Sequence, residues 1–259
     1  MSENSLNLTL GKGKMHFAEF LAGTQTPGGE RFIGNSSEVT IGSEVSELDH
    51  RSSTEGRMKK DFSVVTGVER TGSIVTDDMD KKNIAIFALG AATTTSVASA
   101  TGITQTITDV QPGLTYQIGT TAARPEGARK LASLTVTVGV TLKTLGTDYT
   151  VDLDLGRVTI VTGGTIAADD DIIVAFNQTA HSIVRIEAGF QRKEGALRWI
   201  SNNPDGPQTD YFFPWVKLGP NGDLALVAAE DWNTIPIGIE VFEKDSLPPW
   251  IATGRPVTA

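Results

Sequence analysis

The sequence predicts a mainly β fold, a β-sandwich or barrel with one flanking α-helix and an inserted β-rich segment. Three observations lead to this fold class. Apolar and polar residues alternate strictly in many segments, turn-forming residues separate these segments, and a single stretch has helical periodicity. Strict alternation puts every second side chain on the same face of an extended chain, as a half-buried strand requires.

The clearest alternation lies in the middle of the chain. Residues 134–142 read LTVTVGVTL, and residues 149–155 read YTVDLDL. We expect Gly156-Arg157 to turn the chain into a further strand at 158–161, and a strand at 172–176 to close this meander. Other segments predict further strands, at residues 39–45, 62–68, 184–190, 197–199, 211–218 and 235–241.

Two prolines, Pro214 and Pro236, lie inside expected strands. Proline has no amide hydrogen to donate to a neighbouring strand. Each proline should therefore mark a sheet edge, a bulge or the start of a strand.

One segment, near residues 77–90, has the features of a helix. Asp77 and Asp78 supply carboxylates that can cap the first backbone amides. Gly90 is well placed as the residue just past the helix end. The apolar stripe that we expect to pack on a sheet contains Met79, Asn83, Ile84, Phe87 and Ala88.

Two shifts in composition divide the chain. Residues 91–109 are small and polar, as in a linker, and a second shift follows near residues 179–181. We therefore expect a discontinuous β domain, formed by residues 1–92 and 181–259. Residues 93–180 are an inserted β-rich segment, which is either a domain of its own or an extension of the main sandwich.

The balance of charge limits the partners that the chain can bind. It carries 31 acidic and 22 basic residues and a formal net charge of −9. Sequence-independent binding of nucleic acid needs clustered Lys and Arg that displace counterions from phosphates, so this class of function is disfavoured. DNA could still pass close to the protein, because an acidic wall repels phosphate and lets it slide.

The chain contains no cysteine, which excludes disulfides, thiolate zinc sites and a cysteine nucleophile. No apolar run approaches the roughly 20 residues needed to cross a bilayer. The first residues, MSENSLNL, lack the basic start and apolar stretch of a secretory signal. We expect a soluble protein that is made in the cytoplasm and has no membrane partner.

Residue patterns typical of enzymes are missing. His16, His50 and His181 are far apart and have no zinc-binding spacing. No GxSxG, Walker or GxGxxG motif is present. Asp49, His50 and Ser52 are neighbours in sequence, but a catalytic triad needs the base to lie between nucleophile and acid in space. We therefore expect no catalytic residue, no cofactor and no enzymatic activity.

Two acidic groups are weaker candidates for a metal site. Asp169, Asp170 and Asp171 could supply oxygen ligands to a hard cation. Asp152 and Asp154 alternate along an expected strand, where outward positions are commonly polar. Neither group has the spacing of an EF-hand, so we expect no metal site.

An aromatic group near the end of the chain has two interpretations. Tyr211, Phe212, Phe213 and Trp215 could bind a carbohydrate or stack on bases. At strand spacing, however, such residues more often supply the core on one face and an interface on the other.

A charged segment, residues 46–62 (SELDHRSSTEGRMKKDF), belongs to a longer pattern. This pattern resembles the major tail tube proteins of long, flexible-tailed bacteriophages over about residues 1–90 and 181–245. It consists of LGKGKMHFAEF, then RFIGNSSEVTIGSEVSELDHRSSTEGRMKKDFSVVTGVERTGSIVTDDMDKKNIAIFALG. At the far end it includes EGALRWISNNPDGPQTDYFFPWVKLGPNGDLALVAAEDWNTIPIGIEVFEKD.

The resemblance implies a structural role. Members of this family form hexameric rings whose sheets join around a lumen, and the rings stack into a tube. The tube conducts DNA without specific binding and holds the tape-measure protein. Tail terminator and distal tail proteins are further partners implied by the resemblance, and the implied location is the virion after assembly in the host cytoplasm.

In this family a long loop between the second and third strands reaches an adjacent ring. By position, that loop is roughly residues 47–61 here. Arg51 and Arg57 would be the best anchors, because a guanidinium can bind a carboxylate through two nitrogens, and Met58 could add an adaptable apolar contact. The expected inter-subunit residues are Asp49, His50, Arg51, Glu55, Arg57, Met58, Lys59, Lys60 and Asp61.

Three alternatives compete with this interpretation. The protein could be a β-sandwich adhesin or carbohydrate-binding module that uses the aromatics at 211–215. It could also be another self-assembling subunit, of a secretion tube or a phage head. A secreted hydrolase is disfavoured by the missing signal and catalytic residues. If the chain is a tube subunit, residues 93–180 could decorate the exterior of the tube.

Overall fold

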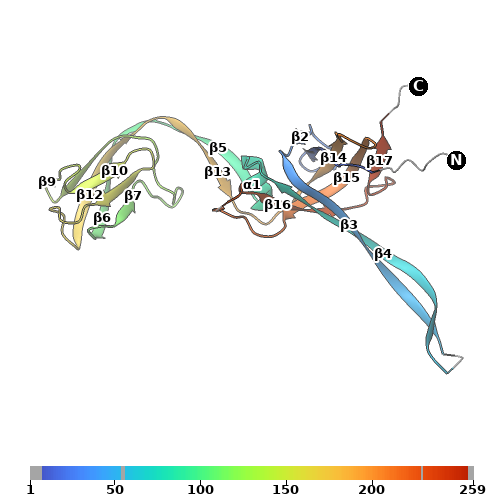
Figure 1. Cartoon of the computed structure of the whole chain (residues 1–259). Coiled ribbons are helices and arrows are strands. Elements are labelled where there is room, and N and C mark those ends of the chain that lie inside the picture. Colours follow the sequence, from blue (N-terminus) through green and yellow to red (C-terminus); the bar gives the residue numbers. More distant parts are fainter. Residues whose placement is uncertain (1–7, 54–55, 229, 256–259) are drawn as a thin grey trace. The chain divides into compact units, whose positions relative to one another are not determined.

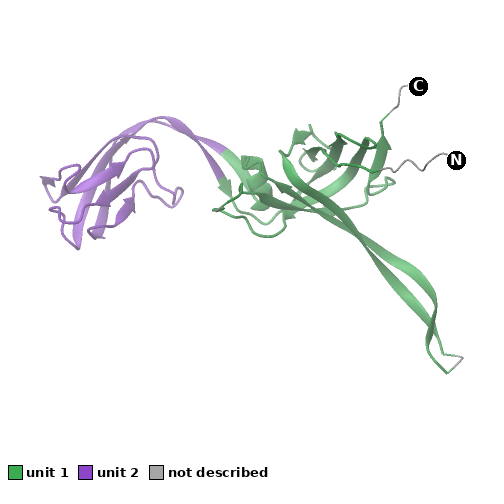
Figure 2. Cartoon of the chain, in the orientation of Figure 1, with its two compact units in different colours: residues 1–93, 186–259 green, residues 94–185 purple. Residues whose placement is uncertain are grey.

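The computed structural model describes residues 8–53, 56–228 and 230–255. Strands make up 56% of the chain and helix 3%, so the expected mainly β class is confirmed. The chain divides into two compact units, unit 1 (residues 1–93 and 186–259) and unit 2 (residues 94–185) (Figure 2). The expected division, after residues 92 and 180, falls near the observed one, after residues 93 and 185.

Unit 1 is built on one large antiparallel sheet (Figure 1). Its described strands are β1 (Gly13–Glu19), β2 (Arg31–Phe32), β3 (Ser36–Ser52), β4 (Lys59–Thr76), β14 (Lys193–Ser201), β15 (Thr209–Pro220), β16 (Ile235–Val241) and β17 (Ile251–Gly254). They follow the order β2-β1-β14-β15-β16-β4-β3, and β17 pairs with β15. Among the described residues, the sheet therefore ends at β3 on one side and at β1 with the short β2 on the other.

The core of unit 1 lies on the face where alternate side chains of these strands are buried. β16 coincides with its expected range, and its residues Ile235, Ile237 and Ile239 are buried. Ile74 from β4 and side chains from β1, β14, β15 and the helix α1 (Lys81–Phe87) complete this core. Each fully buried large apolar side chain contributes about 1.5–3 kcal/mol, so the sheet is held mainly by this one face.

Both prolines lie where a missing amide donor is tolerated. The β14–β15 pairing passes from Gly195 opposite Val216 to Leu197 opposite Phe213, which leaves one extra residue on β15 beside Pro214. Pro236 is the second residue of β16. The expectation of a bulge or a strand start is therefore confirmed.

Helix α1 is confirmed, but its first residue is not capped as expected. The carboxylate of Asp80 accepts a hydrogen bond from the amide of Lys82 at 2.8 Å and forms the cap. The carboxylate of Asp77 instead accepts from the side chain of Asn35 at 2.6 Å. The carboxylate of Asp78, two residues before the cap, accepts from the amide of Asp80 at 3.2 Å.

The far end of the helix also differs from the expectation. Leu89, not Gly90, takes the left-handed backbone conformation (φ 52°). The amides of Leu89 and Gly90 bond to the carbonyls of Ile86 and Ala85 at 3.1 and 2.9 Å, which is the pattern of a Schellman motif. Gly90 is required for a different reason, because a Cβ there would lie 1.7 Å from the carbonyl oxygen of Glu187.

Unit 2 packs two small sheets around one core. Its strands are β6 (Ala100–Val110), β7 (Thr115–Gln117), β8 (Leu131–Val138), β9 (Thr141–Leu142), β10 (Tyr149–Asp152), β11 (Arg157–Ile160) and β12 (Asp170–Gln178). One sheet has the order β6-β12-β8-β9 and the other β10-β11-β7. Val136 and Val174 from the first sheet and Val158 from the second are fully buried together.

The expected single meander is therefore wrong. The strand expected at 134–142 ends at Val138, because Gly139 (φ 57°) turns the chain back into β9. β12 pairs with β6 and β8 and not with the hairpin β10–β11. The turn at Gly156-Arg157 is confirmed, with Gly156 at φ 64° between the paired strands β10 and β11.

Residues 91–109, expected as a linker, form strands instead. β5 (Ala91–Val97) pairs with β13 (His181–Glu187), and β6 pairs with β12. The segment ITQTIT at 103–108 alternates and supplies the β-branched side chains that favour strands. The pair β5–β13 crosses the division between the two units, so the connection is a two-stranded ribbon.

The capping role of Asp80 can be tested by removing its acceptor. Asp80→Ala should lower the free energy of unfolding of unit 1 by about 1 kcal/mol, because the amide of Lys82 loses its partner. Asp80→Asn keeps an acceptor oxygen and should stay within a few tenths of the parent value. Chemical denaturation followed by tryptophan fluorescence measures both. Equal losses in the two variants would contradict the assignment.

Candidate functional site

The segment expected to act between subunits is a hairpin that extends beyond the sheet of unit 1 (Figure 1). β3 and β4 pair from one end to the other, but β16 pairs with β4 only from Arg70 to Thr76. Residues 44–69 thus form a two-stranded ribbon without a third strand among the described residues, which we call the arm. Residues 44–52 alone span roughly 30 Å.

The expected loop at 47–61 is wrong in its conformation. β3 continues to Ser52 and β4 begins at Lys59, so only residues 53–58 connect the strands. Backbone groups along the arm find partners in the opposite strand, which an extended loop could not offer. The alternation of FSVVTGV at 62–68 is the outer part of a longer strand.

On one face of the arm, charged and polar side chains contact one another. Lys60 Nζ lies 2.6 Å from Asp49 Oδ1 and 3.5 Å from Glu47 Oε2. The Ser63 hydroxyl donates to Glu47 at 2.7 Å and to Asp49 at 3.2 Å. These residues are brought together because Asp49 lies opposite Ser63 and Arg51 opposite Lys60 in the strand register.

The contacts on this face alter the ionisation of both partners of the ion pair. The hydrogen bond from Lys60 is the main cause that lowers the pKa of Asp49 below its ordinary value. The same bond raises the pKa of Lys60. Both groups therefore keep their charge at neutral pH, and the pair helps to fix the strand register although exposed ion pairs add little stability.

Other expected inter-subunit residues also have partners within the chain. His50 Nδ1 lies 2.6 Å from Asp61 Oδ1, and Arg51 lies 4.0 Å from Asp49. Lys59 has an interaction partner as well. The strand register therefore already satisfies most of the charges that sequence reasoning assigned to a neighbouring subunit.

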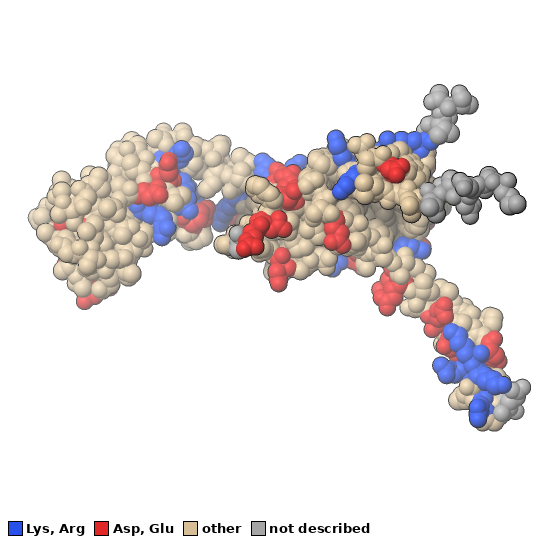
Figure 3. Space-filling view, in the orientation of Figure 1, with Lys and Arg blue, Asp and Glu red and all other residues tan. Residues whose placement is uncertain are grey.

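The turn holds the remaining candidates. Met58 is 68% exposed. Arg57 makes no hydrogen bond or ion pair with the described residues. Glu55 lies outside the described residues. In Figure 3, Lys and Arg side chains gather toward this end of the arm.

The opposite face of the arm carries a group of exposed apolar side chains that sequence reasoning missed. Leu48 lies opposite Val64 and His50 opposite Phe62, and cross-strand partners share one face of a sheet. Leu48 is 68% and Phe62 63% exposed. The alternation at 62–68 indicated a strand with apolar side chains. Which of these side chains share a face with Leu48, however, depends on the register between β3 and β4.

A groove with an aromatic wall lies beside the base of the hairpin. It has a volume of about 660 Å³, and its wall includes Trp199, Tyr211 and Trp250. Ile41 of β3 and Met15 of β1 also line it, and the rings of Tyr211 and Trp250 lie 6.0 Å apart. The groove is large enough for two or three apolar side chains.

The expected aromatic group at 211–215 is divided between environments. Tyr211 and Phe213 line the groove. Phe212 lies under the guanidinium of Arg198 at 4.5 Å, and Trp215 packs on Phe242 at 5.1 Å. Strand alternation and the bulge beside Pro214 cause this division, so the four residues do not form one platform.

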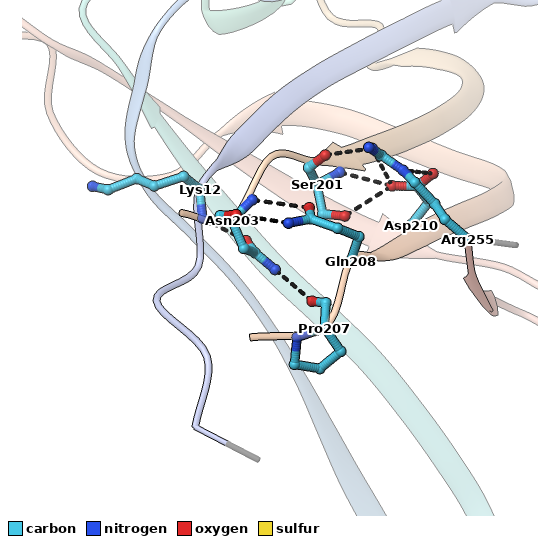
Figure 4. Close-up of polar contacts among 7 residues, drawn as sticks. All are labelled: Lys12, Ser201, Asn203, Pro207, Gln208, Asp210 and Arg255. Atoms are coloured by element: carbon cyan, nitrogen blue, oxygen red, sulfur yellow. Dashed lines mark hydrogen bonds and ion pairs between the residues drawn. The ribbon is translucent and has the colours of Figure 1, made fainter. Parts of the chain in front are cut away.

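A polar network holds the strands next to the groove (Figure 4). The carboxylate of Asp210 accepts from the amide and the hydroxyl of Ser201 at 2.8 and 3.0 Å, and from Arg255 at 3.1 Å. Arg255 also donates to the carbonyl of Ser201. The hydrogen bond from Arg255 is the first cause that lowers the pKa of Asp210. The side chains of Asn203 and Gln208 extend the network.

The described residues assemble no reaction centre from the candidates. His50 contacts Asp61 rather than a serine. The carboxylates of Asp169, Asp170 and Asp171 each accept a hydrogen bond, from the Gln111 side chain at 2.7 Å and from the amides of Ala167 at 2.8 Å and Asp109 at 3.1 Å. Within the described part of the chain, no group of three or more metal-ligating side chains is found. No helix there is long and apolar enough to cross a membrane.

Comparison with known proteins gives one match that spans both units. A family model described as "Protein of unknown function UCP028589" matches residues 8–247. No curated protein matches the chain.

The ion pair of the arm can be tested by titration. Lys60→Met should raise the pKa of Asp49 toward its ordinary value, because the main cause of its depression is removed. Arg57→Met makes the same change of charge in the turn and should leave the Asp49 titration in place. Carboxyl NMR shifts recorded against pH measure both variants. An equal rise in both would mean that net charge, and not the contact, sets the pKa.

The polar network predicts a dependence of stability on pH. The pKa of Asp210 is depressed in the fold, so its contribution is present above the ordinary pKa of about 3.9 and is lost as the pH falls through the folded value. Asp210→Asn should cost about 1–3 kcal/mol at pH 7. The difference from the parent chain should shrink below about pH 4. Urea denaturation across this range measures it, and a constant difference would contradict the prediction.

Proposed function

We propose that this chain, which belongs to the family described as protein of unknown function UCP028589, is a structural protein that assembles with copies of itself. In this proposal it forms rings that stack into the tail tube of a long-tailed bacteriophage. The observation that carries the proposal is a sheet with two free edges joined to a long projecting arm. Both features expose groups that a monomeric protein normally covers.

The free edges support association within a ring. β3 presents an edge of 17 residues, and the other end of the sheet has only the two-residue β2 beside β1. Long exposed edges template pairing with another chain, which most monomers avoid. Because the two edges differ, pairing them is head-to-tail and produces a closed ring if the rotation closes.

The arm supports association between rings. It extends past the neighbouring strand β16 and carries exposed apolar side chains at Leu48, Met58 and Phe62. Exposed apolar groups gathered on a projecting element are typical of a contact surface. The arm occupies the position of the loop that reaches an adjacent ring in the tail tube proteins that the sequence resembles.

The remaining features of the proposal come from the resemblance and from composition. Six subunits per ring, passage of DNA, and contacts with the tape-measure, tail terminator and distal tail proteins follow from the resemblance. A net charge of −9 suits a lumen that does not retain DNA. The proposed location is the virion tail, and unit 2 is proposed to lie on the exterior of the tube. No catalysis and no cofactor are involved.

The aromatic groove favours a second candidate function. Trp199, Tyr211 and Trp250 could bind a carbohydrate, as in an adhesin. Such a protein would bind glycans as a monomer or trimer and would not need the arm. A secretion-tube subunit or a phage head protein would assemble, but into a structure of different form.

Electron microscopy of the purified chain tests the proposed function. Negative-stain images should contain hollow rings or tubes. Deletion of residues 50–60 should abolish tubes and leave a folded protein, because Asp49 and Ser63 stay opposite each other and residues 61–62 can close the hairpin. Circular dichroism checks the fold of the deletion variant. A parent chain that remains monomeric at high concentration would refute the proposal.

A further inference from the structure

Two glutamates lie directly opposite each other on the arm. Glu44 of β3 is paired with Glu69 of β4, and both are exposed. Like charges at directly opposed positions destabilise a strand pair. Neither carboxylate has an ion pair with the described residues, so the monomer contains an acidic pair without compensation.

The glutamates share a face with the apolar side chains of the arm. Glu44 and Leu48 are both even-numbered positions of β3, and the shifts in pairing near them place the extra residue on β4. Alternation therefore puts Glu44, Leu48 and their partners Glu69 and Val64 on one side of the ribbon, with Phe62 beyond them. We call this face the arm stripe. Toward the turn it carries Leu48, Val64 and Phe62 together with His50, and toward the sheet it is acidic.

The groove beside the hairpin has the complementary character. Its wall is aromatic, and Lys12 and Lys14 line it with only one carboxylate, Glu38. The Lys14 ammonium lies 5.9 Å from the ring of Phe32. Neither lysine ammonium forms an ion pair with the described residues. Lys14 thus directs its ammonium to a ring outside the groove lining, and the aromatic surface with the unpaired Lys12 beside it fits an apolar surface beside two unpaired anions.

The apolar part of the arm stripe lies far from the groove of its own chain, although Glu44 directly follows Ser43, which lines it. Ile41 lines the groove, and Phe62 pairs with His50, nine residues farther along β3. Nine paired residues span roughly 30 Å, and the strand pairing leaves no point at which the ribbon could fold back. The apolar part of the stripe can therefore meet such a groove only on a different copy.

We propose that the arm stripe docks in the aromatic groove of a second copy of this chain. Phe62 and Leu48 fill the groove against Trp199, Tyr211 and Trp250, and Glu44 and Glu69 approach Lys12 and Lys14. The inference rests on the proposed function and identifies the surface that receives the arm. It also assigns the aromatic groove to assembly and not to a carbohydrate.

Disulfide trapping tests the contact, since the chain contains no cysteine of its own. The variant Phe62→Cys with Trp250→Cys should form disulfide-linked multimers larger than dimers under mild oxidation. The matched control is Val65→Cys with Trp250→Cys, because Val65 is exposed on the other face of the arm. The control should remain largely unlinked. Thermal melts of the reduced proteins check that both variants fold.

Reversal of charge gives an independent test. Glu44→Lys with Glu69→Lys should weaken self-association roughly tenfold or more, because the arm would then face lysines of the same sign. Adding Lys12→Glu and Lys14→Glu in the same chain should restore it. Sedimentation velocity measures association of the parent and both variants.

The outcomes separate this inference from the proposed function. If the parent chain forms tubes but the Phe62 pair links no better than the Val65 pair, the docking inference is wrong and the proposed function stands. Labelling of Trp250→Cys by a bulky thiol reagent within assembled protein would likewise mean that the groove is open to another occupant, such as a carbohydrate. If the parent neither assembles nor links, both proposals fail.

Discussion

Continuous pairing between β3 and β4 is the constraint on which the exposed surfaces of unit 1 depend. A two-stranded hairpin is marginally stable by itself in water. Here the same two strands continue into the sheet, where Ile74 is fully buried and β16 adds a third strand. The arm is thus the extension of a pairing whose register is set in the core. That register determines which side chains lie opposite each other in the arm.

Charged and apolar residues are interspersed in the sequence of the arm, but they differ in their contacts in the structure. Most of the described charged residues between Glu47 and Asp61 find partners within the ribbon, at distances as short as 2.6 Å. The apolar side chains of Leu48 and Phe62 remain largely exposed, although they lie among those charges in sequence. The surface available to another molecule is therefore less polar than the composition of the segment indicates. Such a division leaves apolar side chains exposed on a ribbon whose charged side chains contact one another.

Much of the fold could be predicted because alternation is a local signal. It identified β16 and the hairpin β10–β11, and helical periodicity with a nearby carboxylate located α1. Strand partners were not predictable, since residues 134–142 and 149–155 have the same pattern but belong to different sheets. Which of the neighbouring aspartates caps the helix depends on the residue at which the preceding strand ends. No local sequence pattern indicates that residue.

The sequence predicted where the candidate site lies, but not which of its side chains share a face. Charge density and resemblance located the segment, yet the shift in pairing between Ser46 and Glu47 determines that Leu48 and Val64 share a face. The groove was still harder to predict, because Met15, Trp199 and Trp250 are far apart in sequence and meet only in the folded chain.

The register shifts along the arm have a consequence for how the family can vary. Inserting a single residue into β3 would carry every side chain beyond it to the reverse face of the ribbon, with ionic and apolar positions exchanged. Inserting two keeps the parity. A single extra residue keeps these faces only where it forms a bulge, as it does at two points of β4 in the arm.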